Sequence, residues 1–372
     1  SGMLVIRRVS GLGGALLANS QIGTFYPPNW LMAPLTPPDG IRVSLLLHIA
    51  WMAAGAYVLA RSALGIDRLP ALLAAVVFTF GGYMGGRVEQ INQLQGLAWL
   101  PWLFWLVHRL DSRPARYIPL LAGALALQFF TGHTQTVFIG GVGMGLYTLM
   151  LPHRWRRLLW FALASVGALV LALPQLVPTL ELTEISNRRG GLNQNEATAF
   201  SFNPFLAARA LLPNYDQQIF AEYIAYPGIV GLGLAFLGLL SLPQERVRTK
   251  LSAFVRAPQF PWFVLALIGL LFAFGQYSPI YWQLAALPGF NLFRVPARWL
   301  VLLALGGAML AGLGLQALSQ HVRGSRGQAS AALIAVTGLL AVGAITLTAR
   351  NPEPIPFSPP ALPTLIGWAI AL

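Results

Sequence analysis

The amino-acid sequence predicts an all-α protein, a polytopic bundle of transmembrane helices. Three observations predict this fold class. Only 9% of the 372 residues are charged, against about 25% in a typical soluble domain, and 56% are hydrophobic. Apolar runs of about 20 residues, the length at which a helix crosses a bilayer, recur along the chain. Most basic residues fall in every second connection between these runs, as the positive-inside rule requires.

The apolar runs predict about ten full spans and one that is cut short. They cover residues 41–61, 69–86, 94–109, 117–133, 134–151, 158–180, 226–242, 260–275, 297–318 and 331–348. A last run begins near Leu362 and stops at Leu372. The run at 117–133 is short, so it is either a tilted span or half of a re-entrant pair with 134–151.

Basic residues set the predicted orientation. Fourteen of the 24 lie in short connections on one side, which is therefore expected to be cytoplasmic. We predict the end of an extracytoplasmic loop at 1–40, a transmembrane bundle at 41–348 with an outer loop at 181–225, and an outer loop with a truncated span at 349–372. Because both ends look like cuts, we expect the chain to be a piece of a larger multi-pass protein.

Composition excludes several classes of function. The net charge of +13 would suggest nucleic acid as a partner, but the basic residues are scattered between apolar runs, so we expect none. The chain has no cysteine, which excludes disulfides, thiolate metal sites and cysteine nucleophiles. Eight of the 11 acids fall on the predicted outer side. The inner acids Asp67, Asp111 and Glu245 each lie among arginines and are expected to moderate positive loops.

Polar residues of the predicted outer side supply the first candidates. Arg87 and Glu89 lie in a polar stretch between two apolar runs. They form either a solvated turn with an Arg87–Glu89 pair or the lining of a polar cavity. His133 and Gln135 lie at a tight turn, where His133 is either a general base or phosphate ligand, or a hydrogen-bonded turn residue. Glu181 ends a helix just before an arginine pair, an arrangement that suits general-base and phosphate-binding roles or a self-neutralising helix end.

Two later segments add further candidates. Arg294 and Arg298 lie at the predicted outer end of a span, and arginine suits bidentate binding of phosphate. The alternative is contact with ordinary lipid headgroups. Glu222 shares a loop with Tyr215, Asp216 and other tyrosines, a composition common to carbohydrate sites and to membrane interfaces in general.

Seven segments taken together resemble the YfhO-type family of bacterial multi-pass membrane proteins. They are "LLANSQIGTFYPPNWL" (16–31), "HIAWMAAGAYVLAR" (48–61), "FTFGGYMGGRVEQINQLQGLAWLPW" (78–102), "TGHTQT" (131–136), "PQLVPTLELTEISNR" (174–188), "LLPNY" with "EYIAYPG" (211–228) and "FRVPARW" (293–299). The resemblance implies a GT-C type fold in the bacterial cytoplasmic membrane. It also implies transfer of a sugar, outside that membrane, from a polyprenyl-phosphate donor to a cell-envelope glycan, glycolipid or protein.

The sequence departs from this family at its start. GT-C enzymes place the catalytic acid in the first outer loop after a first transmembrane helix, and residues 1–40 match only the end of that loop. We therefore expect the usual general base to be missing, and activity is implied for the full-length protein only. Site-lining candidates that the resemblance supplies are Gln21, Tyr26, Glu89, His133, Gln135, Glu181, Glu222, Arg294 and Arg298. Among all the candidate residues named above, the weak catalytic candidates are Glu89, Glu181, Glu222 and His133. The candidates for binding substrate or phosphate are Arg294, Arg298, Arg87, Gln21, Tyr26 and Gln135.

The expected substrate is a lipid-linked sugar, and membrane lipids are the other expected partners. Residue spacing requires no cofactor and defines no metal site, although a divalent metal on the outer acids stays open. Two other classes of function remain as alternatives. One is a transporter or flippase of lipid-linked sugars, and the other is a non-catalytic membrane scaffold subunit.

Overall fold

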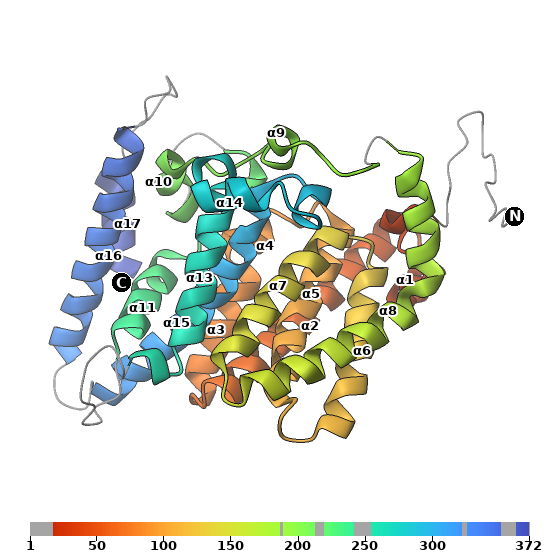
Figure 1. The fold of residues 1–372 in the computed structure, drawn as a ribbon. Helices are drawn as coiled ribbons and strands as arrows, with labels where there is room; N and C mark the ends of the chain where they lie inside the picture. The colour runs from red at the N-terminus through yellow and green to blue at the C-terminus, as the bar shows by residue number, and fades with distance from the viewer. Residues whose placement is uncertain are drawn as a thin grey trace, which may run out of the picture. The chain divides into compact units, whose positions relative to one another are not determined.

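The computed structural model describes residues 18–186, 189–212, 219–241, 254–321, 326–350 and 362–371. In these ranges the regular elements are α-helices and short 3-10 helices, with no strand, which confirms the all-α prediction (Figure 1). The predicted loop end at 1–40 is described only from residue 18 onward. Arg188, Tyr215 and Asp216 lie outside the described residues.

Four helices in the described ranges are long and apolar enough to cross a membrane. They are Pro37–Ala63, Arg68–Gly85, Arg154–Glu184 and Pro296–Gln320. Three shorter apolar helices are Ile229–Leu240, Phe260–Ala273 and Thr337–Ala349. The chain is thus of the membrane type, while the larger number of spans and their orientation stay predictions.

The chain divides into two compact units, of which unit 1 comprises the described residues within Ser1–Gly55 and Val88–Leu192. In unit 1, α6 and α8 lie side by side, and α5 packs against α6 and α7 (Figure 1). Its elements are η1 (Ser20–Ile22), α1 (Pro27–Met32), the first part of α2 (Pro37–Ala63), α5 (Ile91–Arg109), α6 (Pro114–Phe130), α7 (Thr134–Met150) and α8 (Arg154–Glu184).

The short predicted run at 117–133 belongs to a helix of its own. Pro114 starts α6, where its fixed φ suits the first turn and its missing N–H costs nothing. After a turn at 131–133, α7 begins at Thr134. Both helices have 17 residues, so the choice between a tilted span and a re-entrant pair stays open.

Unit 2 comprises the described residues within Ala56–Arg87 and Asn193–Leu372. Its helix α15 (Leu300–His321) packs against α3 (Arg68–Phe80), α11 (Ile229–Leu240) and α13 (Phe260–Ala273). The other elements are α4 (Gly82–Gly85), α9 (Gln194–Ala197), η2 (Pro204–Leu206), α10 (Ala207–Leu211), η3 (Ala221–Tyr223), η4 (Gly275–Tyr277), α14 (Pro279–Leu284), η5 (Phe290–Leu292), η6 (Pro296–Trp299), α16 (Arg326–Ala349) and α17 (Leu362–Ala371).

Glycines let α11 and α15 approach until their backbones touch. A Cβ atom added to Gly238 would lie 2.0 Å from the carbonyl oxygen of Leu310. One added to Gly314 would lie 1.9 Å from the carbonyl oxygen of Leu234. Since no side chain fits at these distances, the crossing requires glycine on both helices, as in close helix pairs of membrane proteins.

Candidate functional site

Three of the predicted site residues meet in unit 2, around the carboxylate of Glu222. Oε2 of Glu222 lies 3.1 Å from Nη2 of Arg87. Oε1 accepts hydrogen bonds from Nη2 of Arg298 at 2.7 Å and from Nε of Arg298 at 3.0 Å. We call these three residues, together with Tyr83, the Glu222 cluster. Its carboxylate is buried between two guanidinium groups, and such charge-assisted hydrogen bonds are among the strongest in proteins.

Arg87 is the fully buried member of this cluster. Its Nη1 donates to the carbonyl of Ala221 at 2.7 Å, and its Nη2 donates to the carbonyl of Glu222 at 3.2 Å. The guanidinium carbon lies 4.2 Å from the centre of the Tyr83 ring, a cation–π geometry. The Tyr83 hydroxyl donates to the carbonyl of Arg298 at 3.0 Å. The cluster therefore joins the end of α4, η3 and η6.

The segment from Arg294 to Arg298 has a strained backbone. Val295 has a φ of 65°, in the left-handed region that β-branched residues rarely occupy. Its N–H donates to the carbonyl of Ala199 at 3.0 Å, which holds this conformation. Arg294 is exposed, while Arg298 is partly buried by its contacts with Glu222. Strain of this kind persists only where the surroundings fix it, and it concentrates at functional sites.

The structure corrects two of the sequence-based interpretations. A solvated turn does not describe Arg87, because this side chain is fully buried and pairs with Glu222. Glu222 is a weak catalytic candidate by sequence, but its carboxylate is buried against guanidinium groups and acts as their counter-ion. Local sequence could not indicate this pairing, since Arg87 and Glu222 are 135 residues apart.

A second buried polar network, in unit 1, contains Tyr26. Nε1 of Trp99 donates to the Tyr26 hydroxyl at 2.9 Å, and this hydroxyl lies 2.8 Å from Nε2 of His48. Nδ1 of His48 lies 2.7 Å from the carbonyl of Ser44. Because a carbonyl only accepts, Nδ1 carries the proton, and Tyr26 donates to Nε2. Burial raises the pKa of Tyr26 to about 12, which keeps its phenol protonated at neutral pH.

His133 and Gln135 lie where α7 begins. The ring nitrogen Nδ1 of His133 accepts from the backbone N–H of Thr136 at 3.3 Å and lies 2.6 Å from Oγ1 of Thr136. His133 is thus the N-cap of α7, as in the hydrogen-bonded alternative for this residue. Gln135 is buried in the first turn, and Gln21 is exposed in η1.

The remaining acidic candidates are exposed. Glu89 lies in the turn before α5, and Glu181 lies in the last turn of α8. Next to it, Glu184 lies 3.6 Å from Nε of Arg189, with both side chains largely in solvent. This pair supports the self-neutralising helix end among the two alternatives for this segment.

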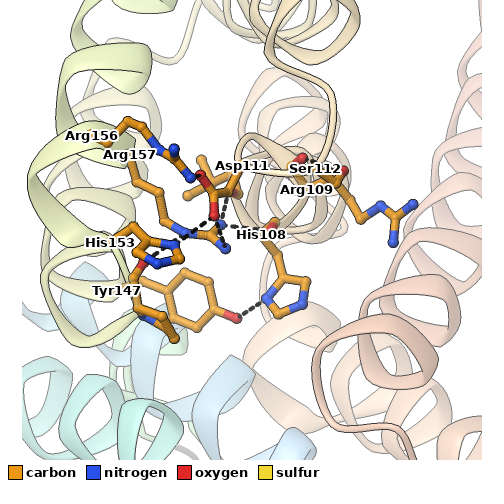
Figure 2. Close-up of polar contacts among 10 residues, drawn as sticks. His108, Arg109, Asp111, Ser112, Tyr147, His153, Arg156 and Arg157 are labelled. Carbon is orange, nitrogen blue, oxygen red and sulfur yellow. Dashed lines mark hydrogen bonds and ion pairs between the residues drawn. The ribbon is translucent and has the colours of Figure 1, made fainter.

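A third cluster surrounds Asp111, in unit 1 (Figure 2). Oδ2 of Asp111 lies 2.9 Å from Nδ1 of His153 and 3.8 Å from Nη2 of Arg157, and Oδ1 accepts from Arg156. We call these four residues the Asp111 cluster. The hydrogen bond from His153, followed by that from Arg156, holds the pKa of the Asp111 carboxyl below its usual range. The expected moderation of a positive loop by Asp111 is confirmed here.

The first turn of α8 explains why Asp111 lies at this point. It contains arginines and no acid, although a helix N-terminus favours negative charge. Asp111, from the connection between α5 and α6, supplies that charge. Arg157 ties the two connections together by donating to the carbonyls of His108 at 2.7 Å and Pro152 at 2.9 Å. His153 has a φ of 52°, a strained value for a residue other than glycine.

Neither comparison with known proteins nor the grouping of possible metal ligands in the described residues assigns a family or a metal site to the chain. No family model matches the chain, and no curated protein matches it. Among the residues that the structure describes, no three His, Asp or Glu side chains come together as metal ligands would.

Proposed function

We propose that the protein is a GT-C type glycosyltransferase of the bacterial cytoplasmic membrane. It would transfer a sugar from a polyprenyl-phosphate donor to a cell-envelope glycan, glycolipid or protein on the extracytoplasmic face. The chain would then cross the membrane about ten times. Support comes from the membrane-length helices, the alternation of basic residues and the segments that resemble the YfhO-type family.

The observation that carries this proposal is the Arg294–Arg298 segment. Arg298 is fixed by Glu222, and Val295 between the two arginines is held in a strained conformation. Arg294 is exposed, and Arg298, four residues later, is partly buried. Two arginines on one short segment, one of them fixed in place, suit a phosphate that gains charge as it leaves.

The chemistry is an inverting displacement. The acceptor hydroxyl oxygen attacks the anomeric carbon of the sugar as the bond from that carbon to the phosphate oxygen breaks. Polyprenyl phosphate leaves with the electron pair, stabilised by Arg294 and Arg298, and a carboxylate takes the hydroxyl proton. Glu89 and Glu181 are the candidates for this base within the chain, because their carboxylates are exposed.

The test uses the full-length protein in liposomes with a radiolabelled polyprenyl-phosphate sugar and membrane extract as acceptor. Arg294→Gln removes one charge-assisted contact to phosphate, so transfer is expected to fall about ten- to a hundredfold. Arg42→Gln is the matched control, because Arg42 is also an exposed arginine of the predicted outer side. Its transfer rate is expected to stay within about twofold of wild type.

The outcomes separate the three classes of function. Undiminished transfer by R294Q would show that Arg294 does not bind the donor phosphate. Movement of the lipid-linked sugar between leaflets without any transfer would identify a flippase. A folded protein that shows neither sugar transfer nor movement of the lipid-linked sugar would point to a scaffold role.

A further inference from the structure

The loops around the Asp111 cluster form a basic surface in unit 1. Arg113 and Arg116 are exposed where the connection between α5 and α6 runs into α6. Arg154 and Arg156 are exposed where the connection between α7 and α8 runs into α8, and His153 is exposed beside them. Asp111 is the acid within these connections, and the cluster already uses its carboxylate. The surface therefore carries a net positive charge that its own residues do not neutralise.

A shallow hollow lies on this surface, at the beginning of α8. It is lined by Leu151, Pro152, His153, Arg154, Trp155 and Arg156. The Trp155 ring is largely exposed, and the guanidinium carbon of Arg154 lies 5.5 Å from its centre. Asp111 contacts His153 and Arg156, two of the residues that line the hollow (Figure 2). Two arginines, a histidine and an indole thus line a single concave patch.

The hollow continues into an apolar helix face. α8 is one of the four membrane-length helices, and most of its apolar window is not buried inside the protein. Leu159, Leu163, Val166 and Val170 are exposed along the helix that starts at the hollow. A ligand with a charged head and apolar chains would match both surfaces. Tryptophan and arginine at such a boundary are typical of the headgroup level of a bilayer.

We propose that this hollow binds the phosphate headgroup of an anionic phospholipid of the membrane. Arg154 and Arg156 contact the phosphate, and Trp155 packs where the headgroup meets the acyl chains. Asp111 is a positioning residue that holds Arg156 and His153 in place. A phospholipid fits better than a free anion because the hollow opens beside an exposed apolar helix face. This site does not depend on the proposed transferase function.

The experiment measures lipid binding by native mass spectrometry of the purified full chain in detergent. Phosphatidylglycerol is titrated against phosphatidylcholine as the zwitterionic reference. Wild type is expected to prefer phosphatidylglycerol, and Arg154→Gln with Arg156→Gln is expected to weaken that binding about thirtyfold. Arg154→Gln alone leaves the pairs of Asp111 intact and is expected to weaken it about fivefold. The single variant keeps the test valid if the double variant unfolds.

The matched control is Arg113→Gln with Arg116→Gln, which removes two exposed arginines from the same surface but none from the hollow. Its affinity for phosphatidylglycerol is expected to stay within about threefold of wild type, because these arginines lie outside the hollow and act only through screened charge. Equal losses in the two double variants would reduce the effect to general electrostatics and overturn the site. Displacement of the lipid by millimolar inorganic phosphate, with no loss in R154Q, would overturn it as well.

Discussion

The Glu222 cluster and the Asp111 cluster are built from the same parts but lie in different surroundings. Each places one carboxylate among arginines contributed by segments that are distant in sequence. In the first, Glu222 is 2% exposed and Arg87 is 0% exposed. In the second, the side chains of Arg156 and His153 are 55% and 65% exposed.

Burial decides what each cluster can do. A buried charge that loses its partner keeps its desolvation cost, so the Glu222 cluster must stay intact for unit 2 to be stable. An exposed charge is solvated whether or not it is paired, so the exposed Arg156 beside Asp111 can exchange partners with water, salt or a lipid headgroup. The buried pair of Arg87 and Glu222 is therefore expected to hold structure, and the exposed arginines beside Asp111 are expected to be open to ligands.

The largest loss of stability is expected for Glu222→Gln. This change leaves Arg87 buried without a counter-ion and should lower the free energy of unfolding by about 3–5 kcal/mol. Unfolding in SDS, followed by circular dichroism, measures the change. Glu89→Gln is the control, since Glu89 is exposed and its loss should cost less than about 0.5 kcal/mol. Equal losses in the two variants would remove the distinction by burial.

A smaller effect is expected for Asp111→Asn. The amide loses charge-assisted contacts to His153 and Arg156, which should cost about 1.5–3 kcal/mol. The same unfolding assay measures it. If D111N lost as much free energy of unfolding as E222Q, the Asp111 cluster would depend on its ion pairs as strongly as the buried Glu222 cluster does.

The contribution of Asp111 should depend on pH. Its pKa is lowered in the folded protein relative to an ordinary value of about 3.9. The folded state therefore binds fewer protons than the unfolded state, and the stabilisation is complete above about pH 5 and lost as pH falls through the folded-state pKa. The stability difference between wild type and D111N should shrink as pH falls below about 4. A difference that stays constant down to pH 3 would contradict the lowered pKa.

The sequence predicted the fold class because hydrophobicity and length follow directly from residue types. The expected runs at 41–61, 158–180 and 297–318 fall in helices long enough to cross a membrane. Candidate residues were also found individually, since Arg87, Glu222 and Arg298 all belong to the predicted set. Their grouping was not predicted, because it depends on how unit 2 brings η3 and η6 to the end of α4.

Two other features were beyond sequence-based prediction for physical reasons. Gly238 and Gly314 are ordinary small residues in the sequence, and only the crossing of α11 with α15 makes them necessary. Asp111 was expected to moderate charge, but the hollow beside it is lined in part by His153, whose backbone is left-handed. A residue in this conformation leaves no pattern in the sequence unless it is glycine or asparagine.

The smallest loss of stability is expected for Arg156→Gln. The salt dependence of this loss gives the sharpest test of the difference between the Asp111 cluster and the Glu222 cluster. The exposed Arg156 should contribute no more than about 1 kcal/mol to stability at low salt. In 1 M salt the screening length falls to about 3 Å, so this contribution should vanish. The loss caused by E222Q should be unchanged by the same salt, because water and ions do not reach a fully buried guanidinium. Unfolding of both variants at low and high ionic strength measures the two responses. A salt-sensitive loss in E222Q would show that ions reach the Glu222 cluster, and would remove the reason for assigning it a structural role.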